Sequence, residues 1–199
     1  MTEKEKMLSG ELYDCQDPEL TALRQTAHRL SREYNRCDET ETARRTAILD
    51  ALLPDRGERV FLQGPVQFDY GVFTRIGENS YANFNFTCLD CCPVTIGRNV
   101  LLGPNVSLLT PLHPLHWLDR RPFLRADDVL TDREKAAPIT IGDDCWLGGN
   151  VTVCGGVTIG AGSVIAAGSV VTRDIPPGVL AAGVPCRPLR PIGPEDRLE

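Results

Sequence analysis

The chain has 199 residues, 42% of them apolar, and its 27 acidic residues against 21 lysines and arginines give a net charge of −6. No apolar run reaches the roughly 18 residues of a transmembrane helix, and the acidic balance argues against a nucleic-acid-binding protein. The charged residues 1–6 contain no apolar segment typical of a secretory signal, so we expect a soluble cytoplasmic protein.

The cysteine spacing does not predict a metal site. Cys88 and Cys91 form one C-x-x-C pair, with Cys92 beside it, and no second pair of matching spacing accompanies them. Structural zinc normally takes four ligands, and disulfides are rare in the cytoplasm. We therefore interpret the eight cysteines as free thiols that act as small core residues, and we expect no metal.

The chain changes character near residue 58. Only two of the 18 glycines lie before residue 60, where charged residues are frequent. This shift predicts a helical segment over residues 1–58, a glycine-rich repeat domain over 59–192 and a tail over 193–199.

Two helices are predicted in the first part. Asp17 and Pro18 provide an N-cap and a first helical residue, and apolar residues then recur every three or four positions. This stripe consists of Leu20, Leu23, Ala27, Leu30 and Tyr34. A second helix is predicted over residues 41–53, ended by Pro54 and Gly57. Its expected buried residues are Ala47, Ile48, Ala51 and Leu52.

A six-residue repeat dominates the second part. From residue 141, six consecutive hexads each open with an aliphatic residue: Ile141, Leu147, Val153, Ile159, Ile165 and Val171. Further hexads begin at Ile76, Ile96 and Leu102, with a two-residue slip after the first. Small residues fit tight corners, and the aliphatic side chains stack inward between neighbouring coils. The repeat therefore predicts a mainly β fold, a parallel β-helix of triangular coils.

The repeat is interrupted by a protruding loop over residues 111–137, and so long an excursion is usually functional or disordered. Its apolar residues predict that it packs against another surface; they are Trp117, Leu118, Phe123 and Leu124. His113 and His116 also lie here, and each is a candidate general base because imidazole exchanges protons near neutral pH. The alternative is a hydrogen-bonded surface histidine.

Other catalytic signatures are absent from the sequence. It contains no nucleophile elbow, Walker loop or dinucleotide-binding fingerprint, and its three histidines do not form a set suited to metal-dependent hydration.

The sequence resembles the hexapeptide-repeat sugar O-acetyltransferases, in particular the maltose, galactoside and nodulation-type enzymes, over about residues 3–192. Besides the hexads, the resemblance rests on Lys6-Met7-Leu-x-Gly10-Glu-Leu-Tyr13, Tyr81-Ala-Asn83-Phe-Asn85, Thr110-x-x-His113-Pro114, Ile141-Gly-x-x-x-Trp146-Leu-Gly-Gly149 and Ala182-Gly-Val-Pro-Cys-Arg187. It implies a left-handed β-helix, a homotrimer with active sites between subunits, and acetyl-CoA as the donor.

The resemblance also implies residue roles. His113, followed by proline as in the family, matches the catalytic base, and Asn83 matches a residue that orients the acceptor or stabilises the oxyanion. The alternative for Asn83 is an asparagine ladder at a coil corner. Matches to acceptor-binding positions, or neighbours of them, are Asp14, Asp17, Asp69, Asp90 and Trp146. Matches to coenzyme A positions are Gly149, Ala167, Thr172, Arg173, Arg187 and Arg190.

Two of these assignments have structural alternatives: Asp17 as a helix cap and Trp146 as a corner hydrophobe. The loop after His113 is longer than in the familiar family members, which leaves the acceptor open. The function implied is acetyl transfer from acetyl-CoA to a sugar hydroxyl. The alternatives are transfer to a xenobiotic or antibiotic hydroxyl, and a non-catalytic assembly protein.

Overall fold

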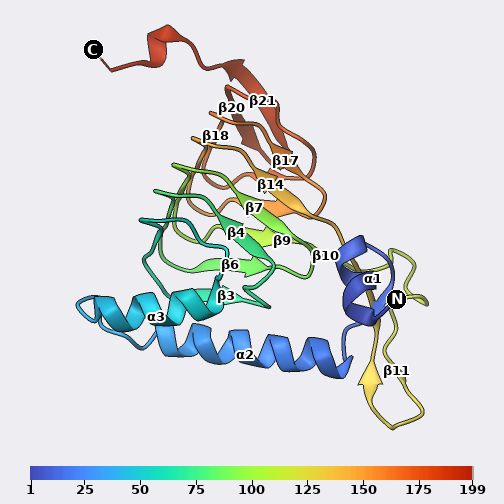
Figure 1. Ribbon diagram of the computed structural model, residues 1–199. Coiled ribbons are helices and arrows are strands. Elements are labelled where there is room, and N and C mark those ends of the chain that lie inside the picture. The colour runs from blue at the N-terminus through green and yellow to red at the C-terminus, as the bar shows by residue number, and fades with distance from the viewer. Residues whose placement is uncertain (199) are drawn as a thin grey trace.

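The hexads form the short strands that they predict. The computed structural model describes residues 1–198, and Figure 1 shows their stacked coils with helices at the N-terminal end. The coils have three parallel faces. Face 1 contains β4 (Thr74–Ile76), β7 (Val94–Ile96), β14 (Ile139–Ile141) and β17 (Thr158–Ile159). Face 2 contains β2 (Phe61–Leu62), β5 (Tyr81–Ala82), β8 (Leu101–Leu102), β15 (Trp146–Leu147), β18 (Val164–Ile165), β20 (Val179–Gly183) and β21 (Cys186–Pro191). Face 3 contains β3 (Val66–Phe68), β6 (Phe86–Leu89), β9 (Ser107–Leu109), β16 (Thr152–Cys154) and β19 (Val170–Val171).

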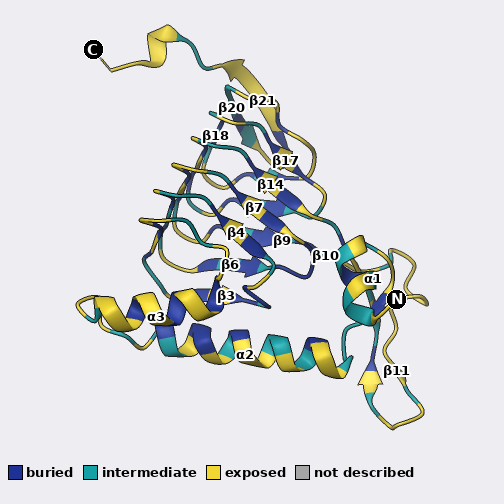
Figure 2. Ribbon diagram, viewed as in Figure 1, coloured by how far each residue is buried: buried dark blue, intermediate teal, exposed yellow. Residues whose placement is uncertain are grey.

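The aliphatic residue of each hexad stacks on its equivalent in the next coil. Ile76, Ile96, Ile141 and Ile159 are direct register partners along face 1. All six hexad-opening residues from Ile141 onward are buried, and Figure 2 shows buried strand positions throughout the coils. The predicted mainly β fold, a β-helix with an N-terminal helical segment, is confirmed.

The two-residue slip lies at the corner after β6, where Asp90 is fully buried. Its Oδ1 accepts a hydrogen bond from Tyr70 N at 2.8 Å, and its Oδ2 accepts one from Thr74 Oγ1 at 2.9 Å. The corner that contains the two extra residues thus carries a carboxylate, and this carboxylate links it by hydrogen bonds to the preceding coil.

Helices α2 (Pro18–Tyr34) and α3 (Thr42–Leu52) lie across the open N-terminal end of the β-helix (Figure 1). Asp17 caps α2 as predicted, because its Oδ1 accepts from Glu19 N at 3.0 Å and Leu20 N at 3.3 Å. The predicted stripe is buried, with Leu23 only partly so. Ala27, Leu30 and Tyr34 share one core with Val66 and Phe68 of the first coil, whereas Leu20 and Leu23 pack in a second cluster with Met7 and Tyr13.

The predicted buried face of the second helix is only half right. Ile48 and Leu52 are buried, but Ala47 and Ala51 are exposed, and Arg45 is buried instead. Arg45 Nη2 donates to Leu62 O at 2.8 Å, so the helix supplies a donor for a backbone carbonyl at the end of the first coils.

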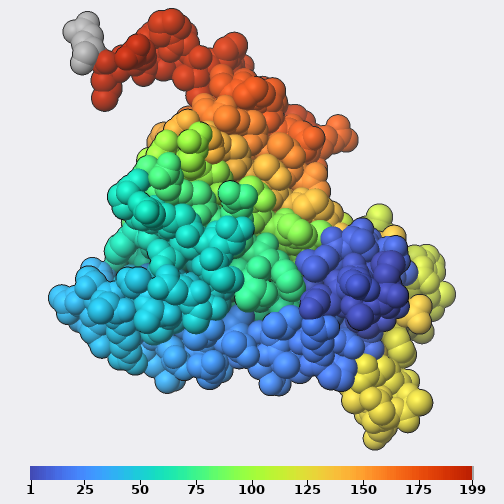
Figure 3. Space-filling view, viewed as in Figure 1, coloured from blue at the N-terminus to red at the C-terminus, as the bar shows by residue number. Residues whose placement is uncertain are grey.

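Both ends of the chain pack against the rest of the structure. The hairpin β20–β21 is antiparallel and closes the C-terminal end, and a short turn η1 (Pro194–Asp196) follows it. At the other end, α1 (Glu3–Ser9) lies beside the protruding loop, as the space-filling view in Figure 3 shows. All eight cysteines are unpaired, as predicted. Among residues 1–198, none of the helices combines the length and apolarity needed to cross a bilayer.

Candidate active site

A small antiparallel sheet positions His113 where the loop leaves the β-helix. Its order is β1 (Tyr13–Asp14), β13 (Arg133–Ala136) and β10 (Pro111–Leu112). β13 lies between the other two strands, with Glu134 opposite Tyr13. The loop therefore begins and ends beside the N-terminal segment, and His113 directly follows its first strand.

Two carboxylates flank the His113 imidazole. Nδ1 lies 3.9 Å from Asp132 Oδ2, and Nε2 lies 4.0 Å from Glu134 Oε1. Asp132 and Glu134 are two positions apart on an extended segment, so their side chains point to the same side. The imidazole is about half exposed, at 49%, and lines a pocket of about 400 Å³. A reachable base beside two anions is suited to proton transfer.

A second pocket of about 260 Å³ extends behind the carboxylates. It is lined by Tyr13, Cys15, Gln16, Arg24, Asp69, Tyr70, Cys91 and Glu134. Hydroxyl, amide, guanidinium and carboxylate groups all face this space, a mixture that can donate and accept hydrogen bonds to a polyhydroxylated molecule.

The thiol and phenol at this pocket are hydrogen-bond donors to its carboxylates. Cys15 Sγ donates to Asp132 Oδ1 at 3.0 Å, and burial together with this bond raises the pKa of the Cys15 thiol to about 11. Tyr13 OH donates to Glu134 Oε2 at 2.8 Å, and burial raises the pKa of Tyr13 far above its usual range. Both groups therefore keep their protons at neutral pH and hold the carboxylates in place.

The two N-terminal aspartates do not line this second pocket. Asp17 caps α2, the alternative considered from the sequence. Asp14 accepts hydrogen bonds from Thr131 Oγ1 and, at 2.7 Å, from Arg125 Nη1. Burial opposes ionisation of Asp14, but these bonds outweigh it and lower its pKa. Asp14 thus anchors the loop, and the neighbouring Cys15 is the side chain that reaches the pocket.

Of the two further aspartates expected at the acceptor, one lines the second pocket. Asp69 lies there, and its Oδ2 accepts a hydrogen bond from Cys91 Sγ at 3.5 Å. Asp90 is fully buried with both oxygens bonded inside the coil, so it has no surface to offer an acceptor. Burial outweighs those hydrogen bonds and raises the pKa of Asp90.

Asn83 and His113 lie on different edges of the triangular β-helix. Asn83 follows β5, at the edge between faces 2 and 3, whereas His113 leaves the edge between faces 3 and 1. Asn83 is not in an asparagine ladder, because its Oδ1 accepts from Phe84 N at 2.8 Å. The ladder runs instead through Asn85, Asn105 and Asn150.

The residues matched to coenzyme A positions follow both edges. Gly149 and Ala167 lie above Asn83 on the edge between faces 2 and 3, while Thr172 and Arg173 lie on the edge of His113. The edge between faces 2 and 3 is lined by small residues. At Gly148 there is no room for a larger one, because an added Cβ would lie only 2.7 Å from Ala167 N in the next coil. An extended ligand can lie close to such an edge.

The remaining matched residues are on face 2 and the closing hairpin. Trp146 is 53% exposed on face 2, so it is not a core residue. Arg187 and Arg190 are exposed on β21. Arg190 pairs with Asp196 at 2.7 Å, and its hydrogen bond lowers the pKa of Asp196 to about 2.

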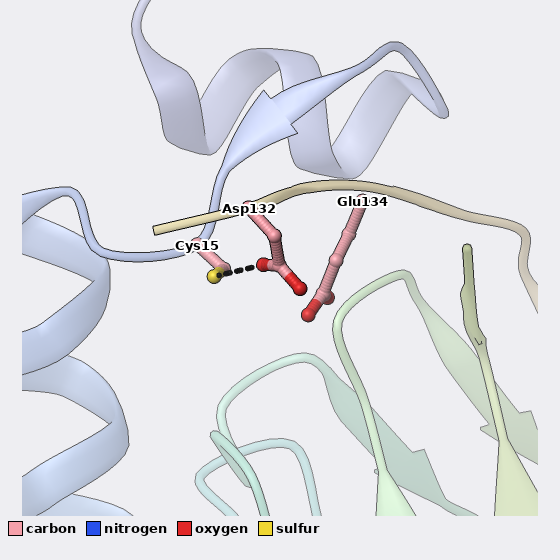
Figure 4. Close-up of side chains that lie close together, drawn as sticks. All are labelled: Cys15, Asp132 and Glu134. Carbon is pink, nitrogen blue, oxygen red and sulfur yellow. Dashed lines mark hydrogen bonds between the residues drawn. The ribbon is translucent and has the colours of Figure 1, made fainter. Parts of the chain in front are cut away.

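Sequence reasoning missed Cys15, Arg24, Asp132 and Glu134. Cys15 and Glu134 are separated by more than a hundred residues and meet only through the pairing of β1 with β13. One local feature of the sequence could have indicated this site. Asp132 and Glu134 are two positions apart, which places two carboxylates on one face of an extended segment. Figure 4 shows Cys15, Asp132 and Glu134 close together beneath β1, a group that could hold a metal ion.

Within one chain, the apolar residues of the loop are exposed, so their predicted packing against another surface stays a prediction. Trp117 and Leu118 are 52% and 51% exposed, and Phe123 and Leu124 are also exposed. His116 lies in the same exposed stretch, 3.9 Å from Asp119.

Comparison with known proteins places the chain in a family. Residues 6–57 match the model of the maltose acetyltransferase hexapeptide capping motif, and residues 138–173 match the bacterial transferase hexapeptide. The galactoside O-acetyltransferase of Escherichia coli is 40% identical over 97% of this chain and 91% of its own.

Two solved structures have about the same sequence identity to this chain as that enzyme does. A maltose O-acetyltransferase from Clostridium difficile has a TM-score of 0.88 and 41% identity, covering 97% of this chain and 98% of its own. A hexapeptide-repeat acetyltransferase from Vibrio cholerae, complexed with acetyl-CoA, has a TM-score of 0.84 and 40% identity, covering 97% of this chain and all of its own (100%). The matched capping segment, the hexapeptide repeats and this level of identity over nearly the full chain show that the chain is a member of the hexapeptide-repeat maltose and galactoside O-acetyltransferase family.

Proposed function

We propose that this protein transfers the acetyl group of acetyl-CoA to a hydroxyl of a sugar, with His113 as the general base. The observation that carries the proposal is the position of His113, at the mouth of one pocket and within 4.0 Å of a carboxylate that lines a second, polar pocket. The names and bound acetyl-CoA of the relatives supply the donor and the class of acceptor.

The chemistry follows from the weakness of an alcohol as a nucleophile near neutral pH. His113 removes the proton of the sugar hydroxyl as its oxygen attacks the thioester carbonyl carbon. The tetrahedral intermediate collapses, the carbon–sulfur bond breaks, and the imidazolium returns the proton to the departing coenzyme A thiolate. Asp132 and Glu134 favour the imidazolium that forms between these steps. An Asn83 amide N–H stabilises the oxyanion.

This assignment requires Asn83 and His113 to meet, although they lie on different edges of one chain. We propose that they meet between adjacent subunits of a homotrimer, where one copy supplies the edge of Asn83, Gly149 and Ala167 and its neighbour supplies His113. The exposed apolar residues of the loop support this arrangement, because a neighbouring copy would cover them. Arg187 and Arg190 then bind the phosphates of acetyl-CoA.

The second pocket receives the sugar. Its polar groups come from α2, the turn after β1, the corner after β3 and strand β13, so it is built from elements that also fix His113. Asp69 and Arg24 offer an acceptor and a donor to neighbouring hydroxyls.

An acceptor panel tests the proposal. The protein is incubated with acetyl-CoA and with maltose, glucosides, galactosides, glucosamine oligomers or hydroxylated antibiotics, and the release of free coenzyme A thiol is measured. We expect release with at least one class of sugar. Faster release with an antibiotic than with every sugar would favour the xenobiotic alternative, and no release with any acceptor would favour a non-catalytic assembly protein.

A further inference from the structure

Three donor atoms of the kinds that bind zinc converge next to the catalytic histidine. The ligand atoms of Cys15, Asp132 and Glu134 all lie within 4.8 Å of one another. Figure 4 shows the three side chains pointing into one space, from the turn after β1 and from the segment that contains β13. They are partly buried, and the 260 Å³ pocket that Cys15 and Glu134 line connects them to solvent.

The imidazole of His113 lies beside this group without belonging to it. Its two ring nitrogens lie 3.9 Å and 4.0 Å from oxygens of Asp132 and Glu134. Ligand atoms of a tetrahedral zinc site are separated by about 3.2–3.7 Å, given metal–ligand distances of 2.0–2.3 Å. The ligand atoms of Cys15, Asp132 and Glu134, which lie within 4.8 Å of one another, therefore need to approach by roughly 1 Å at most.

The local charge also favours a cation. Among residues 1–198, no lysine or arginine forms an ion pair with Asp132 or Glu134, whose only cationic contact is His113. Asp14 nearby is different, because Arg125 neutralises it at 2.7 Å. Two carboxylates without a lysine or arginine partner, together with a thiol, make a donor set that suits zinc, whereas magnesium and calcium prefer oxygen ligands alone.

We propose that Zn²⁺ binds to Cys15, Asp132 and Glu134 beside His113, and that it thereby blocks acetyl transfer. The zinc–sulfur bond forms as the Cys15 thiol releases its proton to solvent. The bound cation beside His113 also opposes the positive charge that the imidazole gains when it accepts a proton from the acceptor. The inhibition rests on the proposed function, whereas the binding site stands on geometry alone.

Cobalt titration of the metal-free, full-length protein tests the site, because thiolate-bound tetrahedral Co²⁺ has a sulfur-to-metal charge-transfer band and visible d–d bands. We expect one Co²⁺ per chain at micromolar concentration, displaced by Zn²⁺. Cys15→Ser should abolish the charge-transfer band, while Cys37→Ser, at another partly buried thiol, should keep it. Glu134→Gln should weaken binding. A charge-transfer band that persists in Cys15→Ser, or binding only at millimolar metal, would overturn the site.

The inhibition has a separate readout. Acetyl transfer by the wild type should fall when Zn²⁺ is added and return with EDTA, whereas Cys15→Ser, compared with its own zinc-free rate, should be several-fold less sensitive. Equal zinc sensitivity in the wild type and Cys15→Ser would overturn the inhibition. If no acceptor is acetylated but the cobalt spectrum appears and depends on Cys15, the proposed function fails and the metal site stands.

Discussion

His113 and His116 lie three residues apart on the same loop, yet their surroundings differ. His113 is flanked by two carboxylates at a pocket, and His116 is a surface residue beside Asp119. We expect His113→Ala to lower kcat by about 10²- to 10⁴-fold, the usual contribution of a general base. The affinity for acetyl-CoA, measured by calorimetry, should be nearly unchanged. His116→Ala is the matched control, and equal losses in the two variants would refute the assignment.

Asp90 shows how a single buried carboxylate holds two corners together. Asp90→Ala leaves Tyr70 N–H and the Thr74 hydroxyl without their partner, which should cost about 1–3 kcal/mol for each unsatisfied group. Asp90→Asn keeps one carbonyl acceptor and should cost less. Urea denaturation of both variants measures these differences, and equal stability of Asp90→Ala and the wild type would contradict this role.

The same carboxylate predicts a pH dependence. Burial raises the pKa of Asp90 in the folded state above its ordinary value of 3.8, so the folded chain binds this proton more tightly than the unfolded chain. Stability relative to Asp90→Asn, which does not titrate, should therefore be greatest below 3.8 and decline as the pH rises through the raised pKa. A difference that grows with pH over this range would contradict the shift.

The loop is held at both ends by the small sheet and in its middle by the Arg125–Asp14 pair. Arg125→Ala should speed amide hydrogen exchange within residues 113–132 and raise the KM for the sugar, because the loop carries Glu134, which lines the pocket proposed for the sugar. The KM for acetyl-CoA should change little. Arg121→Ala, which removes only an exposed contact with Trp117, is the control. Unchanged exchange in Arg125→Ala would show that the pair does not hold the loop.

The elements that could be predicted are those with a local period. The hexads and the stripe of α2 encode their buried positions directly, because spacing along the chain determines which side chains point inward. The buried face of α3 could be predicted only in part. Arg45 is buried because it donates a hydrogen bond to the carbonyl of Leu62, which lies on another element, and the sequence of the helix alone does not reveal that partner.

The candidate site was predictable only in part. His113 and Asn83 lie in short sequence motifs that resemble those of the family. The group of Cys15, Asp132 and Glu134 forms only because strands from distant segments pair, and the spacing of residues along the chain does not reveal that pairing. Likewise, Asp90 was predicted from the sequence to contact the acceptor. In the fold its carboxylate is buried and accepts hydrogen bonds from the preceding coil.

At the scale of the whole molecule, Arg187 and Arg190, which we propose bind the donor, lie on β21, far along the β-helix axis from His113 beside β10 (Figure 1). Replacing Arg187 and Arg190 together by alanine should raise the KM for acetyl-CoA by at least tenfold and leave the KM for the sugar nearly unchanged, because guanidinium groups bind phosphate. Steady-state kinetics with each substrate varied in turn measures the split. An unchanged KM for acetyl-CoA would contradict the assignment.

The central claim is that each active site combines Asn83 of one chain with His113 of another. Mixing His113→Ala and Asn83→Ala chains, each nearly inactive alone, and refolding them together as trimers tests it most directly. Random assembly gives about one quarter of the interfaces both native side chains, so about a quarter of the wild-type rate should return. A mixture that stays as inactive as its components, although mass analysis shows mixed trimers, would contradict the claim.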